Sequence, residues 1–405
     1  MNSLIALLAA AALPQCDVDN AGLTLPPGFC AQVVADGLGR ARHMAVAPNG
    51  DVFVAVPGTP NEADRTGVWV LRDTNGDGRA DVRERLIAVS NAYDVAVVVS
   101  GEQGWLYYST THSVVRHAWR PGQLTVGQAE TVVSGMTDRR QHAPKTFVLG
   151  ADGSLYVNIG APANSCQEQD RQPQSPGLDP CPLLAEAGGI WRFDGRRVGQ
   201  TQADGQVYAT GIRNMVALAL HPTSGALYGV QHGRDMLAQN WGYSDSASAN
   251  LPAEELFRIH AGDDFGWPYC YYDGLRRAKV LAPEYGGDGQ TVGRCANKRG
   301  PLVAFPAHWA PNGVTFYAGT QFPAAFHGGV FVAFHGSWNR DPLPQEGFNL
   351  VFVPFGAEGT PGAWQVFAEG FRPDHRPVDV VVAPDGSLVV SDDRGGRIYR
   401  IQYRP

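Results

Sequence analysis

A pattern of short apolar runs separated by turns recurs along the chain. Each unit begins with an apolar run, continues through a turn rich in Asp, Asn or Gly, and ends in a run that alternates apolar and polar residues. Alternation with a period of two is typical of strands, and turn residues between two such runs indicate hairpins. The pattern predicts six strand pairs, at residues 44–56, 95–110, 147–160, 218–231, 314–336 and 380–393.

A third predicted strand follows each pair, and several of these strands share Ile or Val, an aromatic residue and Arg. They read GVWVLRD, SVVRHAW, GGIWRFDG, EELFRI, NLVFVPF and GRIYRI. One such antiparallel sheet cannot bury both of its faces, so copies stack around an axis. We therefore expect an all-β fold, a single six-bladed β-propeller over residues 16–405. The segment 29–34 is predicted to close the ring as the outer strand of the sixth blade.

Two insertions interrupt the repeat. The turn glycines Gly153, Gly225 and Gly329 lie 72 and 104 residues apart, whereas the other intervals are 49 to 57 residues. Long ordered loops on a rigid β scaffold are where function usually lies. Each insertion contains two cysteines, which are Cys166 and Cys181 in the first and Cys270 and Cys295 in the second. We expect each pair to staple a loop that has too little core to order itself.

The first 15 residues are predicted to be a secretory signal. Their apolar run, Leu4 to Leu13, is too short to span a bilayer but fits the apolar region of such a signal, and Ala10 to Ala12 provide small residues for cleavage. The alternatives are a wrongly assigned start and a buried N-terminal segment. We expect a periplasmic or secreted protein without a membrane span.

The six cysteines favour disulfides, because their number is even, the chain carries an export signal and no Cys-x-x-Cys motif occurs. The spacing does not decide which cysteines join, and six buried thiols are the alternative.

The net charge of the chain limits the expected partners. A net charge of -7 without a run of Lys or Arg excludes nucleic acid and anionic membranes as expected partners.

The loop from Asp73 to Glu84 has the full spacing of a calcium-binding loop, with Gly78 at its sharp turn. The flanking residues are predicted strands rather than helices, so we expect a structural Ca²⁺ that rigidifies a blade turn. The alternative is an acidic, solvated turn. The predicted ligands are Asp73, Asn75, Asp77, the carbonyl of Arg79, Asp81 and Glu84.

Other reactive side chains lie where predicted strands begin or end. His142 precedes the third pair, Arg213 and Asn214 precede the fourth, His335 follows a strand of the fifth, and Arg376 precedes the sixth. In a propeller these positions converge on one mouth of the central channel. Taken singly, structural histidines and surface ion pairs are the alternatives. Together they favour a site that binds an anionic, planar ligand and abstracts a proton.

Six segments carry a resemblance to a known family. They are RHMAVAPNGDVFV, HAPKTFVLGADGSLYVNIG, GIRNMVALALHP, FGWPYCYYDG, FHGSWNR and RPVDVVVAPDGSLVVSDDRGGRIYRI. As a set they resemble the glucose/sorbosone dehydrogenase family, which comprises pyrroloquinoline quinone (PQQ) enzymes on six-bladed propellers. The resemblance implies a PQQ- and Ca²⁺-dependent enzyme that oxidises an aldose, pyranose or sorbosone by proton abstraction and hydride transfer to the quinone. Electrons would pass to an external acceptor, a quinone or a cytochrome.

The resemblance also implies roles for individual residues. His142 matches the base that takes the proton from the sugar hydroxyl. Arg213 and Asn214 match the pair at the quinone, where a guanidinium stabilises the developing oxyanion. Gly233 and Arg234 match positions whose carbonyls hold a second Ca²⁺, which binds the cofactor and polarises it as a Lewis acid.

His335 and Arg376 match family positions near the carboxylates of the cofactor, and Arg42 is a further candidate for binding them. Two positions depart from the glucose enzymes of the family. Ala161 stands where those enzymes carry Asp, so the sequence leaves the partner of His142 undetermined, and His335 stands where they use Lys. These departures make the chain more similar to the sorbosone and fungal pyranose branch.

Two other functions remain open from the residues alone. One is a calcium-dependent lactonase or other hydrolase, which needs carboxylates and amides around an ion in the channel. The other is a non-catalytic, ligand-binding propeller. Four aromatic residues are candidates for stacking on a sugar ring, with core packing as the alternative; they are Trp267, Tyr271, Tyr272 and Trp338.

Overall fold

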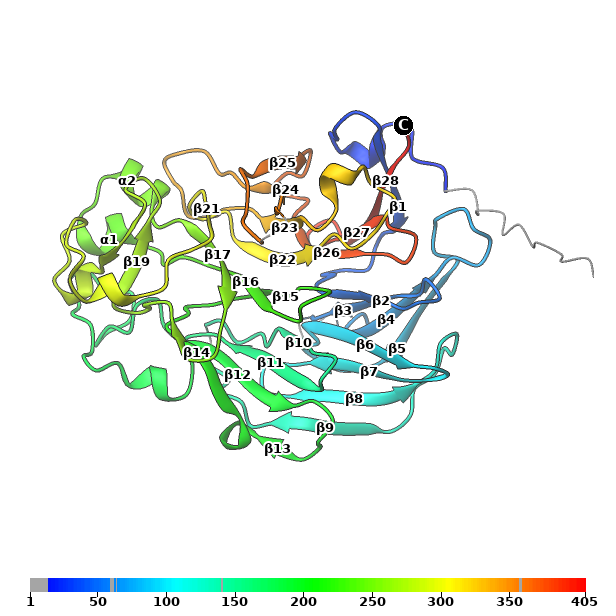
Figure 1. The fold of residues 1–405 in the computed structure, drawn as a ribbon, viewed down its shortest axis with the longest axis horizontal. Helices are drawn as coiled ribbons and strands as arrows, with labels where there is room; N and C mark the ends of the chain where they lie inside the picture. Colours follow the sequence, from blue (N-terminus) through cyan, green and yellow to red (C-terminus); the bar gives the residue numbers. More distant parts are fainter. Residues whose placement is uncertain (1–13, 59–61, 63, 140, 357–358) are drawn as a thin grey trace, which may run out of the picture.

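The computed structural model describes residues 14–58, 62, 64–139, 141–356 and 359–405 (Figure 1). Residues 1–13, most of the predicted signal, lie outside these ranges, so the signal stays a prediction. Within them the chain forms 28 strands and only two short α-helices. The colours of Figure 1 follow the chain once around the molecule, from blue through cyan, green and yellow to red. The expected all-β, six-bladed propeller is confirmed.

Each blade contains four antiparallel strands. The first blade is β2–β5 (Met44–Val46, Val52–Val56, Gly67–Arg72, Val82–Ile87), and the second is β6–β9 (Asp94–Ser100, Gln103–Ser109, Val114–Trp119, Ala129–Ser134). The third is β10, β11, β12 and β14 (Phe147–Leu149, Ser154–Ile159, Gly189–Asp194, Gln206–Thr210). All six predicted strand pairs coincide with the first two strands of a blade.

The fourth blade is β15, β16, β17 and β21 (Ala217–Leu220, Leu227–Gln231, Glu254–Ile259, Val303–Phe305). The fifth is β22–β25 (Pro311–Phe316, Val330–His335, Phe348–Val353, Gln365–Ala368). The sixth joins β26–β28 (Pro377–Val382, Leu388–Asp392, Arg397–Tyr403) to β1 (Phe29–Ala35) from the other end of the chain.

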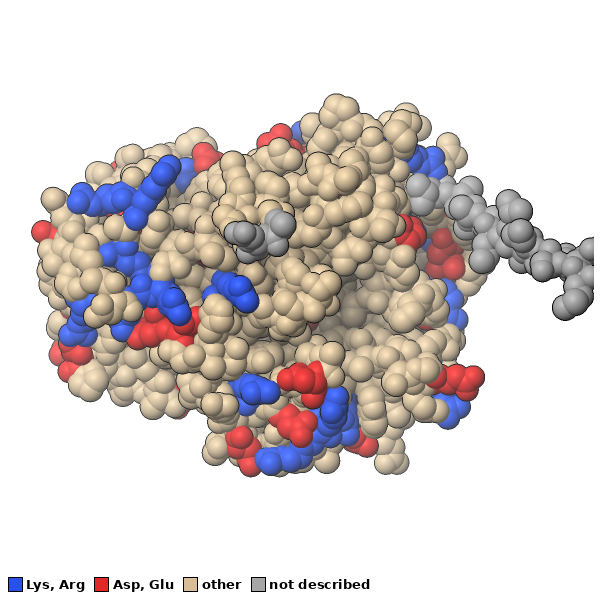
Figure 2. All heavy atoms as spheres, viewed as in Figure 1, with Lys and Arg blue, Asp and Glu red and all other residues tan. Residues whose placement is uncertain are grey.

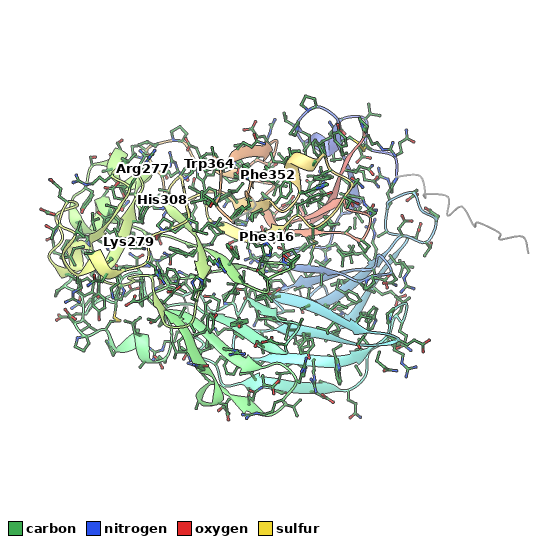
Figure 3. The ribbon with its side chains drawn as sticks, viewed as in Figure 1. Arg277, Lys279, His308, Phe316, Phe352 and Trp364 are labelled. Atoms are coloured by element: carbon green, nitrogen blue, oxygen red, sulfur yellow. A yellow bond between two sulfur atoms is a disulfide. The ribbon has the colours of Figure 1, made fainter. Side chains whose placement is uncertain are left out.

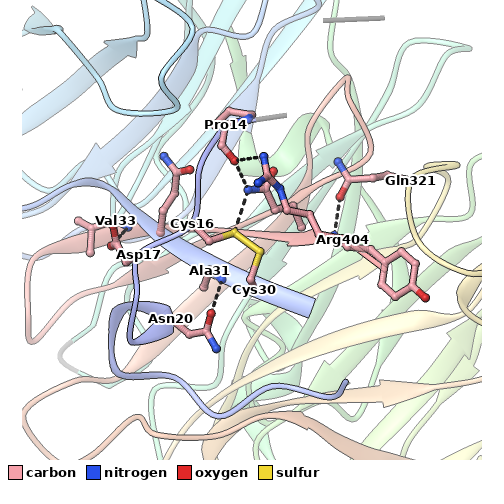
Figure 4. The surroundings of a disulfide bond; sticks show 12 residues. Pro14, Cys16, Asp17, Asn20, Cys30, Ala31, Val33, Gln321 and Arg404 are labelled. Atoms are coloured by element: carbon pink, nitrogen blue, oxygen red, sulfur yellow. Dashed lines mark hydrogen bonds between the residues drawn. A yellow bond between two sulfur atoms is a disulfide. The ribbon is translucent and has the colours of Figure 1, made fainter. Parts of the chain in front are cut away.

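Ring closure follows from this pairing of β1 with β28. Phe29 lies opposite Tyr403 and Ala31 opposite Ile401, and the buried pair Ala31 and Ile401 contributes to the core. The predicted closing strand is therefore confirmed. A disulfide between Cys16 and Cys30 secures the N-terminal segment beside this strand pair (Figure 4).

Insertions enlarge the third and fourth blades. Two-residue strands from these parts of the chain each add a parallel edge to the preceding blade: β13 (Gln200–Thr201) beside β9 of the second blade, and β18 (Asp263–Asp264) beside β14 of the third. The fourth blade carries α1 (Leu237–Trp241), α2 (Asp245–Asn250) and the hairpin of β19 (Cys270–Asp273) and β20 (Ala278–Leu281), at the left of Figure 1. No helix in the described part of the chain is long and apolar enough to cross a membrane.

Apolar side chains fill the spaces between neighbouring blades. Phe53 of the first blade meets Trp119 of the second edge to face, with ring centroids 5.1 Å apart. Phe316, Phe352 and Trp364 belong to the clusters that join the fourth, fifth and sixth blades (Figure 3). Full burial of one such side chain stabilises the fold by about 1.5–3 kcal/mol. Stacking thus covers the faces that single sheets leave open.

The cysteines form three disulfides, between neighbours in the sequence: Cys16–Cys30, Cys166–Cys181 and Cys270–Cys295. Disulfides are confirmed over free thiols, and the structure decides the pairing that spacing left open. Two of the bonds staple the two insertions.

On the face drawn in Figure 2, basic side chains gather toward the end formed by the fourth-blade insertion, and acidic and basic side chains mix over β12 and β13.

Candidate active site

The loops before and after the innermost strands enclose a cavity of about 320 Å³. It lies where the strand ends of several blades meet, as expected for a channel mouth. Six of the residues singled out from the sequence line it, and they are Arg42, His142, Arg213, Asn214, Gly233 and Trp338. Arg42 and Trp338, 296 positions apart along the chain, thus share one cavity.

His142 is oriented by a backbone carbonyl. Its Nδ1 lies 2.5 Å from the oxygen of Ala161, and because a carbonyl only accepts, the hydrogen must sit on Nδ1. The lone pair is therefore on Nε2. Burial of the ring and the nearby Arg213 guanidinium hold the pKa of His142 well below its usual range. A neutral imidazole with a fixed tautomer can accept a proton at Nε2.

Ala161 also joins the base to the neighbouring arginine, because its amide donates to the carbonyl of Arg213 at 2.7 Å. The adjacent Gly160 leaves the space for this contact. A Cβ added there would lie 2.6 Å from Cβ of His142 and 2.7 Å from Oδ1 of Asn214. The position at which the sequence lacks a carboxylate therefore still supplies a hydrogen-bond acceptor, through the main chain.

Asp235 organises the cations on one side of the cavity. Its Oδ2 accepts from Arg213 at 2.8 Å and from Arg171 at 3.1 Å, and its Oδ1 accepts from Asn339 at 2.8 Å. Burial alone would raise the pKa of Asp235, but the two arginines lower it to about 2. One carboxylate thus neutralises only part of the positive charge of two guanidinium groups.

A second carboxylate, Asp393, joins three of the predicted cofactor residues. It accepts from Arg42 at 3.0 Å and from His335 Nε2 at 2.9 Å. Arg376 lies beside the other ring nitrogen of His335, at 3.5 Å, and donates to the carbonyls of Gly336 and Ser337. His335 and Arg376 are therefore linked to Arg42 but are not part of the cavity lining.

The two predicted carbonyl ligands of the cofactor ion follow β16. The amide of Gly233 donates to Glu254 at 2.7 Å, and burial raises the pKa of this Glu254 carboxyl to about 8. The side chain of Arg234 turns away from the cavity into a buried ion pair with Glu284. Among the residues described, no group of three or more His, Cys, Asp or Glu could hold a metal. The Ca²⁺ role of Gly233 and Arg234 rests on their carbonyls and stays a prediction.

The candidate calcium loop joins β4 to β5 in the first blade, and none of its residues lines the cavity. Its carboxylates accept from amides of the same loop: Asp73 from Gly76 and Gly78, each at 2.7 Å, and Asp77 from Arg79 at 2.8 Å. Glu84 lies on β5, opposite Val70 of β4, and is exposed. These contacts are those of a solvated turn, and a bound ion remains a prediction.

Only one of the four candidate stacking aromatics lies at the cavity. Trp338 is 64% exposed and forms part of the cavity wall. Trp267 and Tyr271 are buried, and Trp267 Nε1 donates to the carbonyl of Asn164. For these two, core packing is the correct interpretation.

Backbone strain concentrates around the cavity. Positive φ angles are sparsely populated for residues other than glycine and cost about 1–3 kcal/mol each, so they persist where the surroundings enforce them. They occur at four residues that line the cavity, which are His142 (52°), Arg171 (59°), His308 (65°) and Ala310 (58°).

Sequence reasoning missed three groups that the structure brings to the site. Asp235 follows the predicted Gly233-Arg234 pair directly, and Asp393 lies in the turn after β27, so their positions at strand ends could have marked them. Arg171 lies on an irregular loop and gives no local signal.

An anionic, planar cofactor fits these side chains. Arg42, Arg171 and Arg213 line the cavity, and Asp235 and Asp393 only partly compensate them. Nε of Arg42 is buried without a hydrogen-bond partner in the described part of the chain, and an unpaired buried donor is costly unless a ligand accepts from it. The carboxylates of PQQ supply such acceptors.

Comparison with known proteins yields one family match. A family model described as TrAA12-like matches residues 23–404. The chain is 23% identical over 446 aligned positions to a PQQ-dependent sugar dehydrogenase of Hypocrea jecorina, covering 98% of this chain and 94% of that protein. It is 26% identical to a PQQ-dependent pyranose dehydrogenase of Coprinopsis cinerea, covering 93% and 54%. A protein of uncharacterised function from Borreliella burgdorferi is 30% identical over 213 residues, 49% of each chain. The chain thus spans about half the length of the last two relatives.

Solved structures agree on the fold. A Trichoderma reesei enzyme of carbohydrate-active family AA12 superposes with a TM-score of 0.78 at 22% identity, covering 96% of this chain and 99% of that one. The holo PQQ domain of the Coprinopsis cinerea enzyme gives 0.75 at 22%, covering 96% and 98%. A PQQ-bound aldose sugar dehydrogenase of Streptomyces coelicolor gives 0.57 at 20%, covering 94% and 99%. The family match and the two fungal PQQ-dependent relatives agree with the branch expected from Ala161 and His335.

Proposed function

The chain belongs to the TrAA12-like family, and we propose that it is a PQQ-dependent dehydrogenase that oxidises a sugar or sugar aldehyde. One observation carries the proposal. A neutral histidine that lines the cavity, with its hydrogen held on Nδ1, stands beside guanidinium groups that have more positive charge than their carboxylate partners neutralise. A base next to an anion site is what proton abstraction coupled to an anionic redox cofactor requires.

His142 is the proposed base. Its Nε2 would accept the proton of the sugar hydroxyl, and PQQ, when bound, would supply the hydride acceptor. The Ala161 carbonyl keeps the ring in the required tautomer, and the Nδ1–H becomes a stronger donor to it when the ring turns cationic. Arg213, buried beside the base, stabilises negative charge that develops in the cavity.

The cofactor carboxylates are assigned to Arg42, with His335 and Arg376 on the same ion-pair network. Asn214 flanks Arg213, and the carbonyls of Gly233 and Arg234 would hold a Ca²⁺ at the cofactor. A second, structural Ca²⁺ is proposed for the loop Asp73–Glu84. Trp338 offers an exposed indole for the sugar ring.

Two features of the proposal lie outside the cavity. Three disulfides support an oxidising compartment, the periplasm or the exterior. The electrons of the oxidised sugar are proposed to leave to an external acceptor, a quinone or a cytochrome.

Reconstitution tests the proposal. The purified protein, stripped with a chelator, is titrated with PQQ in the presence and absence of Ca²⁺, and dye reduction is followed against aldoses, other pyranoses and sorbosone. We expect PQQ-dependent turnover of at least one sugar. Lactone hydrolysis with Ca²⁺ alone would instead identify a hydrolase, and the absence of both PQQ binding and turnover would leave a non-catalytic propeller.

A further inference from the structure

The disulfide Cys166–Cys181 closes a loop between β11 and β12 that reaches the segment carrying His142. Two consecutive side chains of this loop hold Gln141, the residue before the base. Asp170 Oδ2 accepts from Gln141 Nε2 at 2.5 Å. Arg171 donates to Gln141 Oε1 through Nε at 3.1 Å and through a terminal nitrogen at 3.0 Å. The amide of Gln141 is thus engaged at both ends by the loop.

The same Arg171 side chain also bonds a carboxylate that lines the cavity. Its Nη2 donates to Asp235 Oδ2 at 3.1 Å, the oxygen that also accepts from Arg213. Its Nη1 lies 3.3 Å from the sulfur of Met236. One guanidinium therefore connects the segment of the base to the carboxylate that holds the buried arginine.

The fully buried residue Asn164, just before the loop, joins the loop to the same hydrogen-bond network. The main-chain N–H of Asn164 donates to Asp170 Oδ1 at 2.9 Å. Its side-chain oxygen accepts from the amide of Asp235 at 2.9 Å and from Arg213 at 3.1 Å. The loop is therefore joined to the cavity wall at both Asn164 and Arg171.

Strained backbone lies on both sides of this connection. Positive φ angles occur at His142 (52°), and in the loop at Cys166 (54°), Arg171 (59°) and Gln174 (58°). Such residues relax toward common conformations unless side-chain contacts hold them. The contacts of Gln141 with Asp170 and Arg171 are side-chain contacts immediately beside the strained His142.

We propose that Asp170 and Arg171 are positioning residues, and that the loop 166–181 keeps His142 and Arg213 in one fixed arrangement through Gln141 and Asp235. This inference rests on the proposed function insofar as it concerns turnover. Its structural content, that the loop holds the His142 segment, stands separately. A base displaced by about 1 Å loses about 100-fold in rate, so the loop would act on the chemical step and not on sugar binding.

Arg171→Gln tests the proposal. We expect kcat to fall about 10- to 100-fold, with KM for the sugar changed less than about threefold, because positioning acts on the transition state. Arg171→Lys keeps the charge but cannot donate to Gln141 and Asp235 at the same time as the planar guanidinium does. Its kcat should therefore lie between those of the wild type and Arg171→Gln. Arg192→Gln is the matched control, since Arg192 bonds Ser154 on the outer part of the same blade, and its kcat should equal that of the wild type.

Hydrogen exchange of residues 141–149 in the protein without cofactor provides a readout independent of activity. The segment should exchange faster in Arg171→Gln than in the wild type or Arg192→Gln. Unchanged exchange overturns the inference whatever the enzyme does. Unchanged kcat in Arg171→Gln, with an active wild type, overturns it as well. An inactive wild type in which exchange rises as expected contradicts the proposed function but supports the positioning role.

Discussion

Two loops of almost equal length, each closed by a disulfide, hold very different parts of the molecule. Cys16 and Cys30 are 14 positions apart, and Cys30 belongs to the ladder of β1 and β28, where main-chain hydrogen bonds repeat along the strands. Cys166 and Cys181 are 15 positions apart and close an irregular loop held by charged and amide side chains. In the ladder, many equivalent main-chain hydrogen bonds stabilise the strands together. At the site, by contrast, each side-chain hydrogen bond fixes the position of one particular group. Loss of the first should cost stability, and loss of the second should cost function.

The largest expected effect is at the base. His142→Ala should reduce turnover by about 10² to 10⁴-fold while PQQ remains bound and the melting temperature changes little, because the ring serves the site and not the core. Steady-state kinetics and a PQQ titration measure this. His112→Ala is the control, since that ring is exposed on the second blade. Unaltered turnover in His142→Ala would refute the base assignment.

A cofactor contact comes next. Arg42→Gln removes one charge-assisted contact worth about 1.5–3 kcal/mol, so PQQ affinity should fall about 10- to 100-fold with kcat at saturating PQQ less affected. Fluorescence titration of the protein without cofactor gives the affinity. Arg400→Gln on β28, whose partners are Asp385 and Ser387 on the ring-closure blade, should leave PQQ affinity unchanged. Equal losses in both variants would mean that Arg42 acts only through stability.

The two disulfides test the comparison directly. Cys16→Ser with Cys30→Ser should lower stability by about 2–4 kcal/mol, seen as a lower melting temperature, with kcat per folded molecule unchanged. Cys166→Ser with Cys181→Ser should lower stability and also lower kcat about tenfold, because the opened loop no longer holds the base His142 in position. If both double variants lost only stability, the contrast between the two regions would be wrong.

A smaller effect is expected at the rim. Trp338→Ala should raise KM for the sugar about 2- to 12-fold, the equivalent of about 0.5–1.5 kcal/mol of ring contact. The melting temperature should not move, because the side chain is 64% exposed. Kinetics are measured at saturating PQQ with two sugars of different ring substitution, so that a change in sugar binding is separated from a change in cofactor binding. An unchanged KM for both sugars would remove Trp338 from the substrate site.

The smallest effect concerns pH. Because burial and Arg213 lower the pKa of His142, the ring stays neutral, and able to accept a proton, below the pH at which an ordinary histidine is protonated. The acid limb of kcat/KM should therefore lie below pH 6.5. At pH 6 an unshifted histidine would be about one quarter neutral, so the predicted activity is up to about fourfold higher. An acid limb at pH 6.5 or above would contradict this.

Sequence reasoning succeeded where neighbouring residues carry the information. Alternation and turn residues predicted the strand pairs and the closing strand β1, since each depends on local geometry. Strand-end position alone brought His142, Arg213 and Asn214 to one mouth of the channel. Two of the four aromatic candidates, Trp267 and Tyr271, were wrong as stacking residues, because burial depends on how the insertions fold over the blades.

The sequence by itself determined the repeated blade, the ring and the set of residues at the strand ends, because period, turn chemistry and repetition are local properties. Only the tertiary structure decided which cysteines join, that a main-chain carbonyl at Ala161 orients His142, and that Asp235, Asp393 and Arg171 connect the cations. A carbonyl is present at every residue, so no sequence letter marks the one that acts. Partners such as Arg171 and Asp235 are 64 positions apart and meet only because packed blades and a stapled loop bring them together.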